Sequence, residues 1–158
     1  MVLYAVHNVS QGKQHVKISF SSEYGEITQQ LKISEEILES GKISPAKFSN
    51  SVFNAPVAMT TIAEKNTQGY SAICSGKNSF YYGLCECLAA LRSGADKERI
   101  FVHGDELVPH PYNALIGGEN TPFVLALFLS VAPSESSLEV PDNFSCSGLD
   151  FAKFFLHI

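Results

Sequence analysis

The feature that most constrains the fold is the stretch 69–91, in which a short apolar strand is followed at once by a long apolar helix. We expect a strand at residues 70–74, a sharp turn at Ser75-Gly76, and a helix over residues 77–91. One helix face repeats apolar residues at helical spacing: Phe80, Leu84, Cys87 and Leu91. Glu86 is the one charged residue among the inner positions, so we expect a central helix that other elements wrap.

A strand that turns abruptly into a helix brings several useful groups to one point. The first helical side chains, the free backbone N–H groups and the positive end of the helix dipole all lie there. Many folds place a nucleophile at such a turn. The residues at the turn therefore decide which chemistry this chain can perform.

Length and charge limit the class of protein. The 158 residues suffice for one domain with a core, and 45% of them are hydrophobic. A net charge of −5 argues against nucleic acid and anionic membranes as main partners. The longest apolar run, residues 123–132, is too short to span a membrane. The chain has four cysteines: Cys74, Cys85, Cys87 and Cys146. They show no Cys/His spacing typical of a zinc site, and we expect a reduced, cytoplasmic chain.

Helices and strands alternate along the rest of the chain, which predicts an α/β layered fold with a mixed sheet. The expected helices cover residues 1–9, 26–39, 50–63 and 148–156, in addition to the central helix. The further strands cover 16–20, 99–104 and 121–131, the last of them buried on both sides. We expect loops at residues 107–118 and 132–142. The inner face of the helix at 26–39 is expected to contain Ile27, Leu31, Ser34 and Leu38. We expect a single domain over residues 1–158. Its first helix has no N-cap, so we also expect that an upstream segment is missing.

Four segments occur in the order and spacing of a known family. They are residues 21–26 (SSEYGE), 44–55 (SPAKFSNSVFNA), 75–80 (SGKNSF) and 103–106 (HGDE). Together they resemble the small beta-ketoacyl synthase-like N-terminal domain proteins of bacterial aryl polyene, polyketide and fatty-acid gene clusters. The resemblance covers roughly residues 1–131. It implies a thiolase-like fold, here half of a condensing-enzyme fold with a buried central helix.

In the full-length condensing enzymes of this family, the nucleophilic cysteine sits at the strand-to-helix turn. Counting along the motifs places that position at Lys77 or Asn78 in this chain. The two catalytic histidines belong to the other half of those enzymes, and His103 lies in a strand that matches a structural motif. The pattern is similar to the chain-length-factor subunits of type II polyketide synthases, which have lost the nucleophile and pair with an active partner.

Every candidate residue also has a plain structural interpretation. Cys74 is an alternative nucleophile, but a cysteine in a buried strand is more often a small hydrophobic residue. Lys77 could bind the phosphate of a carrier protein's acyl-phosphopantetheine, or it could be a solvated lysine. Asn78 or Ser79 could simply cap the helix. Asp105 and Glu106 end a strand where sites often lie, but an Asp-Glu pair before a proline-containing loop is usually just turn chemistry.

The first functional hypothesis is a non-catalytic subunit, not an enzyme on its own. It would pair with an active 3-oxoacyl-acyl carrier protein synthase and help shape its acyl tunnel. The alternative is an active acyltransferase or condensing enzyme that uses Cys74. A third reading is a free acyl- or carrier-binding module. No cofactor or metal is expected. The resemblance implies a full-length ketosynthase as partner in a heterodimer, possible binding of acyl carrier protein, and self-association when the chain is alone.

The helix at 50–63 carries apolar side chains on more than one side, so we expect it to lie at the partner interface with the strand at 70–74. The interface candidates are Asn54, Val57, Met59 and Thr61. A charge at Val57 is expected to weaken the complex and leave the fold intact. Leu84→Ala or Leu88→Ala in the central helix is expected to cost about 2–5 kcal/mol.

Overall fold

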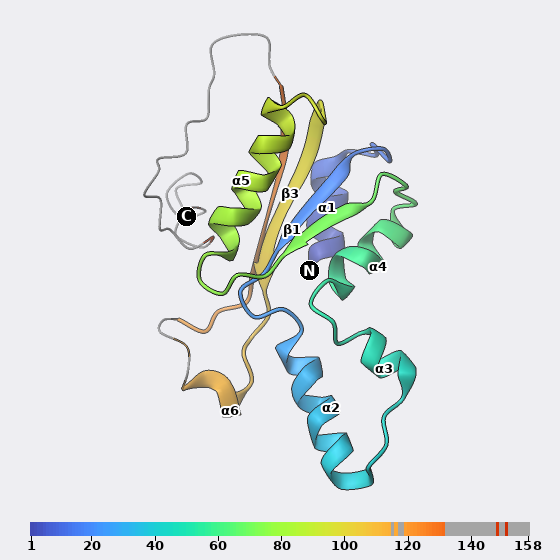
Figure 1. Ribbon diagram of the computed structural model, residues 1–158, viewed down its shortest axis with the longest axis vertical. Coiled ribbons are helices and arrows are strands. Elements are labelled where there is room, and N and C mark those ends of the chain that lie inside the picture. The colour runs from blue at the N-terminus through green and yellow to red at the C-terminus, as the bar shows by residue number, and fades with distance from the viewer. Residues whose placement is uncertain (115, 117–118, 132–147, 149–150, 152–158) are drawn as a thin grey trace.

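A four-stranded mixed sheet forms the centre of the protein (Figure 1). The computed structural model describes residues 1–114, 116, 119–131, 148 and 151. The strand order is β2 (Tyr70–Ile73), β1 (Lys17–Ser21), β3 (Glu98–Asp105) and β4 (Phe123–Ser130). The first three strands are parallel, and β4 pairs antiparallel to β3. The sequence prediction of a mixed α/β sheet is confirmed.

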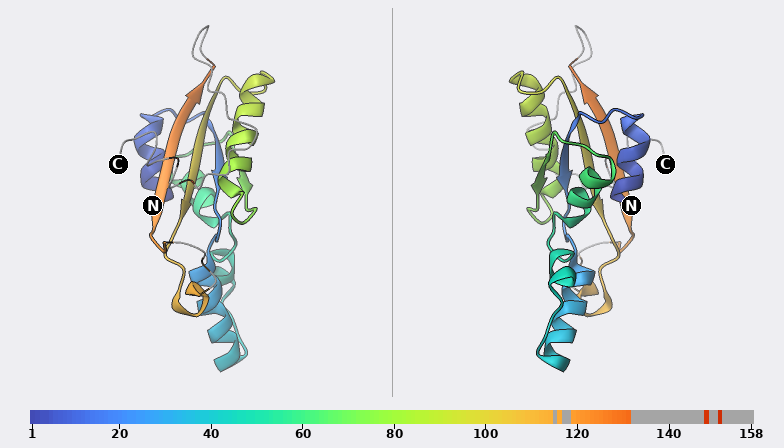
Figure 2. Two further views of the ribbon diagram at one scale, coloured as in Figure 1. Left: turned by 90° about the vertical axis from the view of Figure 1, so that its left-hand side faces the viewer. Right: turned by 90° about the vertical axis from the view of Figure 1, so that its right-hand side faces the viewer.

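Helices cover both faces of this sheet, as the edge-on views of Figure 2 show. On one face lie α1 (Val2–Ser10) and α4 (Ala55–Ala63). On the other face lies α5 (Ser79–Arg92), which directly follows β2 in the chain. The connection between the parallel strands β2 and β3 therefore passes through α5, as expected for a crossover helix in a parallel sheet.

The two faces differ in polarity because strand side chains alternate between them. Ile18 and Phe20 of β1 pack toward α1 and α4, together with Ile100 and Val102 of β3. The intervening residues point toward α5, and several of them are polar although buried: Ser19, Ser21, Arg99 and His103. The core under α5 is thus a mixed one, with Phe80, Leu84 and Phe101 packed beside hydrogen-bonding groups.

A helical arm projects beyond one end of the sheet (Figure 1). It consists of residues 27–54, with α2 (Ile27–Ser40) and the short helix α3 (Pro45–Ser49), which the sequence did not predict. The predicted inner face of α2 is wrong: Leu38 is 86% exposed, and Ile33 is the buried residue of the helix. The reason is that α2 packs along α3 instead of lying on the sheet.

Several other expectations need correction. Within the described residues, α5 is buried on one face only, and Tyr82 on its outer side is 49% exposed. Strand β4 lies at the sheet edge, and only Leu125 in it is buried. A short helix, α6 (His110–Asn113), lies within the expected loop 107–118. The expected loop at 132–142, Cys146 and most of the closing helix at 148–156 fall outside the described residues, although Phe151 packs against Phe80 with ring centroids 5.1 Å apart.

Candidate functional site

The strand-to-helix turn between β2 and α5 is built as the sequence predicted. Gly76 has a φ of +58°, a left-handed conformation that glycine adopts without strain. The Ser79 hydroxyl accepts a hydrogen bond from the backbone N–H of Ser75 and donates one to the Gly76 carbonyl, each over 2.7 Å. Ser79 itself is fully buried. It therefore fastens the turn from inside and is not available as a reacting group.

Cys74 lies one residue after the end of β2, and its side chain is exposed. The expectation of a buried strand cysteine is wrong, because β2 is an edge strand that ends at Ile73. The thiol donates a weak hydrogen bond to the Glu23 carbonyl over 3.7 Å. Partial burial raises the pKa of the Cys74 thiol, and the negative charges of Asp105 and Glu23 raise it further, against a lowering by the Gly76 backbone. A nucleophilic cysteine needs the opposite shift.

Lys77 and Asn78, which the sequence analysis assigned to the family's nucleophile position, are both exposed at the start of α5. Asn78 occupies the N-cap position, but its side chain makes no capping hydrogen bond. The Ser79 hydroxyl does not cap the helix either, because it forms its hydrogen bonds within the turn. Helix capping by a side chain therefore explains neither residue. At the first residues of the helix, the structure thus brings together an amine and an amide, with the exposed thiol of Cys74 on the strand side of the turn.

A buried polar cluster lies at the carboxyl ends of β1 and β3. Ser21 Oγ and His103 Nδ1 are 2.8 Å apart, and His103 Nε2 lies 4.0 Å from Asp105 Oδ2. Burial lowers the pKa of His103 to about 4, with Asp105 and Ser21 acting in the opposite direction. Although serine, histidine and aspartate meet here, Ser21 has no exposed surface and cannot meet a substrate. This cluster is structural.

A second polar cluster joins α5 to three strands and was only half visible in the sequence. The Glu86 carboxylate accepts hydrogen bonds from Ser19 Oγ over 2.8 Å and from Ser71 Oγ over 3.0 Å. It also pairs with the buried guanidinium of Arg99 over 2.8 Å, and Asp96 lies 3.2 Å from Arg99 Nε. The sequence analysis had singled out Glu86, because it is the one charged residue among the inner positions of the helix. Nothing in the strand pattern showed that Arg99 points inward.

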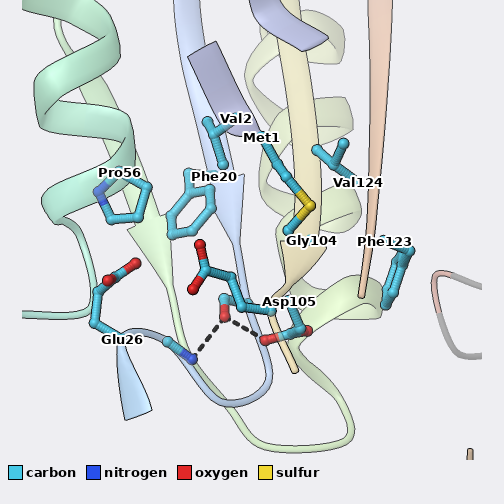
Figure 3. A pocket seen from close by; sticks show the side chains of 12 residues that line it. Met1, Val2, Phe20, Glu26, Pro56, Gly104, Asp105, Phe123 and Val124 are labelled. Atoms are coloured by element: carbon cyan, nitrogen blue, oxygen red, sulfur yellow. Dashed lines mark hydrogen bonds between the residues drawn. The ribbon is translucent and has the colours of Figure 1, made fainter. Parts of the chain in front are cut away.

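A small pocket opens between the starts of α1, α4 and β4, the turn before α2 and the ends of β1 and β3 (Figure 3). Its volume is about 50 Å³, and its walls combine apolar side chains such as Phe20 and Pro56 with the acids Glu26, Asp105 and Glu106. Burial and the nearby Glu106 raise the pKa of Glu26. A pocket of this size accommodates a few water molecules, far less than the several hundred Å³ of a typical ligand site.

The predicted interface residues have different surroundings. Met59 lies on the outer side of α4 and is 58% exposed. Ile62, one turn further along the same helix, is 71% exposed. Val57 has no exposed surface and belongs to the core under α1, so the expectation that a charge there leaves the fold intact is wrong. Asn54 and Thr61 are partly exposed, and Asn54 Nδ2 donates a hydrogen bond to the Tyr70 hydroxyl over 2.8 Å.

In the part of the chain that the structure describes, no three histidine, cysteine or acidic side chains gather in a way that could hold a metal ion. None of the described helices is long and apolar enough to cross a membrane.

The comparisons with known proteins agree with the fold and the motifs. Residues 1–147 match the family described as beta-ketoacyl synthase, N-terminal domain. No curated protein matches the chain. Among solved structures, a chain in the ketosynthase (ApeO) in complex with its chain length factor (ApeC) from Xenorhabdus doucetiae superposes with a TM-score of 0.76 at 27% sequence identity. The match covers 87% of this chain and 60% of that chain. The fold is therefore thiolase-like, and the chain belongs to the beta-ketoacyl synthase N-terminal domain family.

Proposed function

We propose that this chain is a non-catalytic, chain-length-factor-type subunit that pairs with an active 3-oxoacyl-acyl carrier protein synthase. The observation that carries the proposal is the strand-to-helix turn, where Lys77 and Asn78 are exposed at the point to which the motif count assigns the family's nucleophile. The similar solved structure is a ketosynthase bound to its chain length factor, which supports the same kind of pairing for this chain. Aryl polyene, polyketide and fatty-acid synthesis are the settings in which such a pair would work.

Two exposed features favour pairing through β2 and α4. In the described sheet, β2 pairs with β1 only, so its other edge offers unpaired backbone groups to a second chain. On the neighbouring helix, Met59 and Ile62 expose apolar surface. A second chain that added a strand to this edge would form backbone hydrogen bonds with β2 and would bury the apolar face of α4. Both contributions stabilise strand addition between proteins. Self-association through the same surface is expected when the partner is missing.

The pocket beside Glu26 and Asp105 offers no acyl site of its own. At about 50 Å³ it is too small for an acyl chain or a phosphopantetheine arm. A subunit that helps to shape an acyl tunnel would complete that tunnel with the walls of its partner. Acyl carrier protein is then expected to deliver its acyl-phosphopantetheine to the partner's cysteine.

The alternative function, an enzyme that uses Cys74, draws support from one observation: the thiol is exposed beside the turn. Intact mass spectrometry after incubation with acyl- and malonyl-carrier protein separates the two functions. The subunit proposal predicts an unchanged mass for the wild type and for Cys74→Ala. A stoichiometric acyl adduct that disappears in Cys74→Ala would establish the enzyme and overturn the subunit proposal.

A further inference from the structure

The edge strand β4 turns an apolar face toward the side of the sheet on which α5 lies. Its side chains on this face are leucines: Leu125, Leu127 and Leu129. Helix α5 packs mainly on the two central strands, β1 and β3, so β4 lies outside its main contact. Leu125 is nevertheless only 6% exposed. Another part of the chain must therefore contribute to the cover of β4 on this side.

Phe151 provides part of this cover. Its side chain is 6% exposed, and its ring centroid lies 5.1 Å from that of Phe80 in the first turn of α5. It also belongs to the same buried cluster as Leu84 of α5 and Leu125 of β4. A residue that follows β4 in the sequence thus returns to the α5 side of the sheet and bridges the helix and the edge strand.

Gly148 makes a second contact on the same side, and only glycine can make it. A Cβ atom at this position would overlap His103 Cδ2 and would lie 3.1 Å from Phe80 Cδ2. The His103 ring has no room to move away, because it packs against Phe80 and Phe123 with centroid distances of 5.3 and 5.4 Å. Its Nδ1 is also 2.8 Å from Ser21 Oγ. Gly148 therefore lets the chain lie directly on a fixed ring.

We propose that Gly148 and Phe151 form an internal cover on the α5 side of β4, which withholds this face from the ketosynthase and leaves β2 and α4 for pairing. This inference rests on the proposed function for the identity of the partner. A partner on the covered face would first have to expose Phe151 to water again, and that cost would oppose its binding. The β2 edge has no such cost, because within the described sheet β2 pairs with β1 only.

Phe151→Ala tests the cover and its consequence with three measurements on the full chain. The dye 1-anilinonaphthalene-8-sulfonate reports exposed apolar surface, hydrogen exchange reports the protection of β4, and titration with a co-encoded ketosynthase reports pairing. We expect dye fluorescence to rise about threefold and amide exchange in residues 123–130 to become about tenfold faster. The Kd for the ketosynthase should stay within about twofold of the wild-type value, because the covered face is not the contact.

A second variant and a control support this test. Gly148→Ala keeps the Phe151 ring but blocks the approach to His103, so it should change dye fluorescence and exchange in the same direction. If Phe151→Ala does not fold, Phe151→Leu keeps a smaller apolar side chain and should give a smaller change of the same sign. The matched control is Phe48→Ala, since Phe48 is 58% exposed on α3, and it should neither raise dye fluorescence nor alter exchange in β4.

Three results would overturn the inference, and they can be told apart. Unchanged dye fluorescence and exchange in Phe151→Ala and Gly148→Ala would show that these residues do not cover β4. A folded Phe151→Ala chain with a Kd raised about tenfold or more would place the covered face in the interface and leave the subunit proposal standing. A wild-type chain that binds no ketosynthase would remove the proposed function and the assignment of faces, whereas the dye and exchange results would still decide whether the cover exists.

Discussion

The guanidinium of Arg99 lies 2.8 Å from the carboxylate of Glu86, and this pair links α5 to β3 across the polar side of the sheet. The Arg99 side chain is 2% exposed, whereas that of Glu86 is 33% exposed. Asp96 provides a second negative charge beside the same guanidinium. The pair thus holds the helix that follows the strand-to-helix turn in one register on the sheet.

Glu86→Gln should destabilise the protein by about 1–3 kcal/mol, because it leaves Arg99 buried with a weaker partner. Urea unfolding at neutral pH measures the change. The control is Glu98→Gln, which breaks the exposed pair of Glu98 with Lys13 and should cost less than about 1 kcal/mol. Equal losses in the two variants would show that the Glu86–Arg99 pair does not differ from a surface pair.

Leu84→Ala should cost about 2–5 kcal/mol, because Leu84 is buried between α5 and the sheet. The sequence predicted the same cost for Leu88→Ala, but Leu88 is only partly buried, so its loss should be smaller. Tyr82→Ala, on the exposed side of α5, should stay within about 0.5 kcal/mol. The midpoint of denaturant unfolding ranks the three variants, and any other order would mean that the helix is rotated.

The protein should lose stability as the pH falls from about 6.5 toward 4, and His103 should cause part of the loss. The pKa of His103 is lowered to about 4 in the folded chain from 6.5, so over this range the unfolded state binds the extra proton. The full effect amounts to about 3 kcal/mol. His103→Gln should flatten this part of the pH profile, whereas His110→Gln, at an exposed site, should not. A profile that His103→Gln leaves unchanged would contradict the assignment.

Alkylation by iodoacetamide should modify Cys74 well before Cys87, because Cys74 is exposed and Cys87 is buried. Burial raises the pKa of the Cys87 thiol to about 11, and partial burial raises that of Cys74 from 9.0. The rate at Cys74 should therefore still be rising with pH above 9. Peptide mass spectrometry follows each site. A rate that levels off below pH 7 would reveal an activated thiolate and favour the enzyme alternative.

The sequence predicted those parts of the structure that depend on local patterns. Helical spacing identified Phe80, Leu84, Cys87 and Leu91 as one face of α5, and all four are buried. The abrupt change from β2 to α5 predicted the turn at Ser75-Gly76. These features depend on residues close together in the chain, where periodicity and turn chemistry are informative.

Features set by long-range packing could not be predicted in this way. Leu38 has the spacing of a buried residue, but α2 leaves the sheet, and no local signal shows that. Arg99 stands near the start of β3, where the sequence pattern suggests a surface residue, and its ion pairs with Glu86 of α5 and with Asp96 explain why it points inward. Val57 and Ile62 lie on one apolar helix, and the position of α1 decides that Val57 is buried and Ile62 is exposed.

Ile62→Glu should weaken binding to a ketosynthase about tenfold or more and leave the fold intact, because Ile62 is 71% exposed on α4. Val57→Glu places a charge in the core and should prevent folding instead. Circular dichroism checks the fold of each variant before binding is measured. A folded Ile62→Glu protein with wild-type affinity would remove α4 from the interface.

Size-exclusion chromatography with light scattering, on the chain alone and mixed with the ketosynthase from its own gene neighbourhood, tests the central proposal most directly. A subunit of this family should elute with the ketosynthase as one species with a mass equal to the sum of both chains, and should self-associate when alone. A stable monomer that elutes separately from every such ketosynthase would contradict the account.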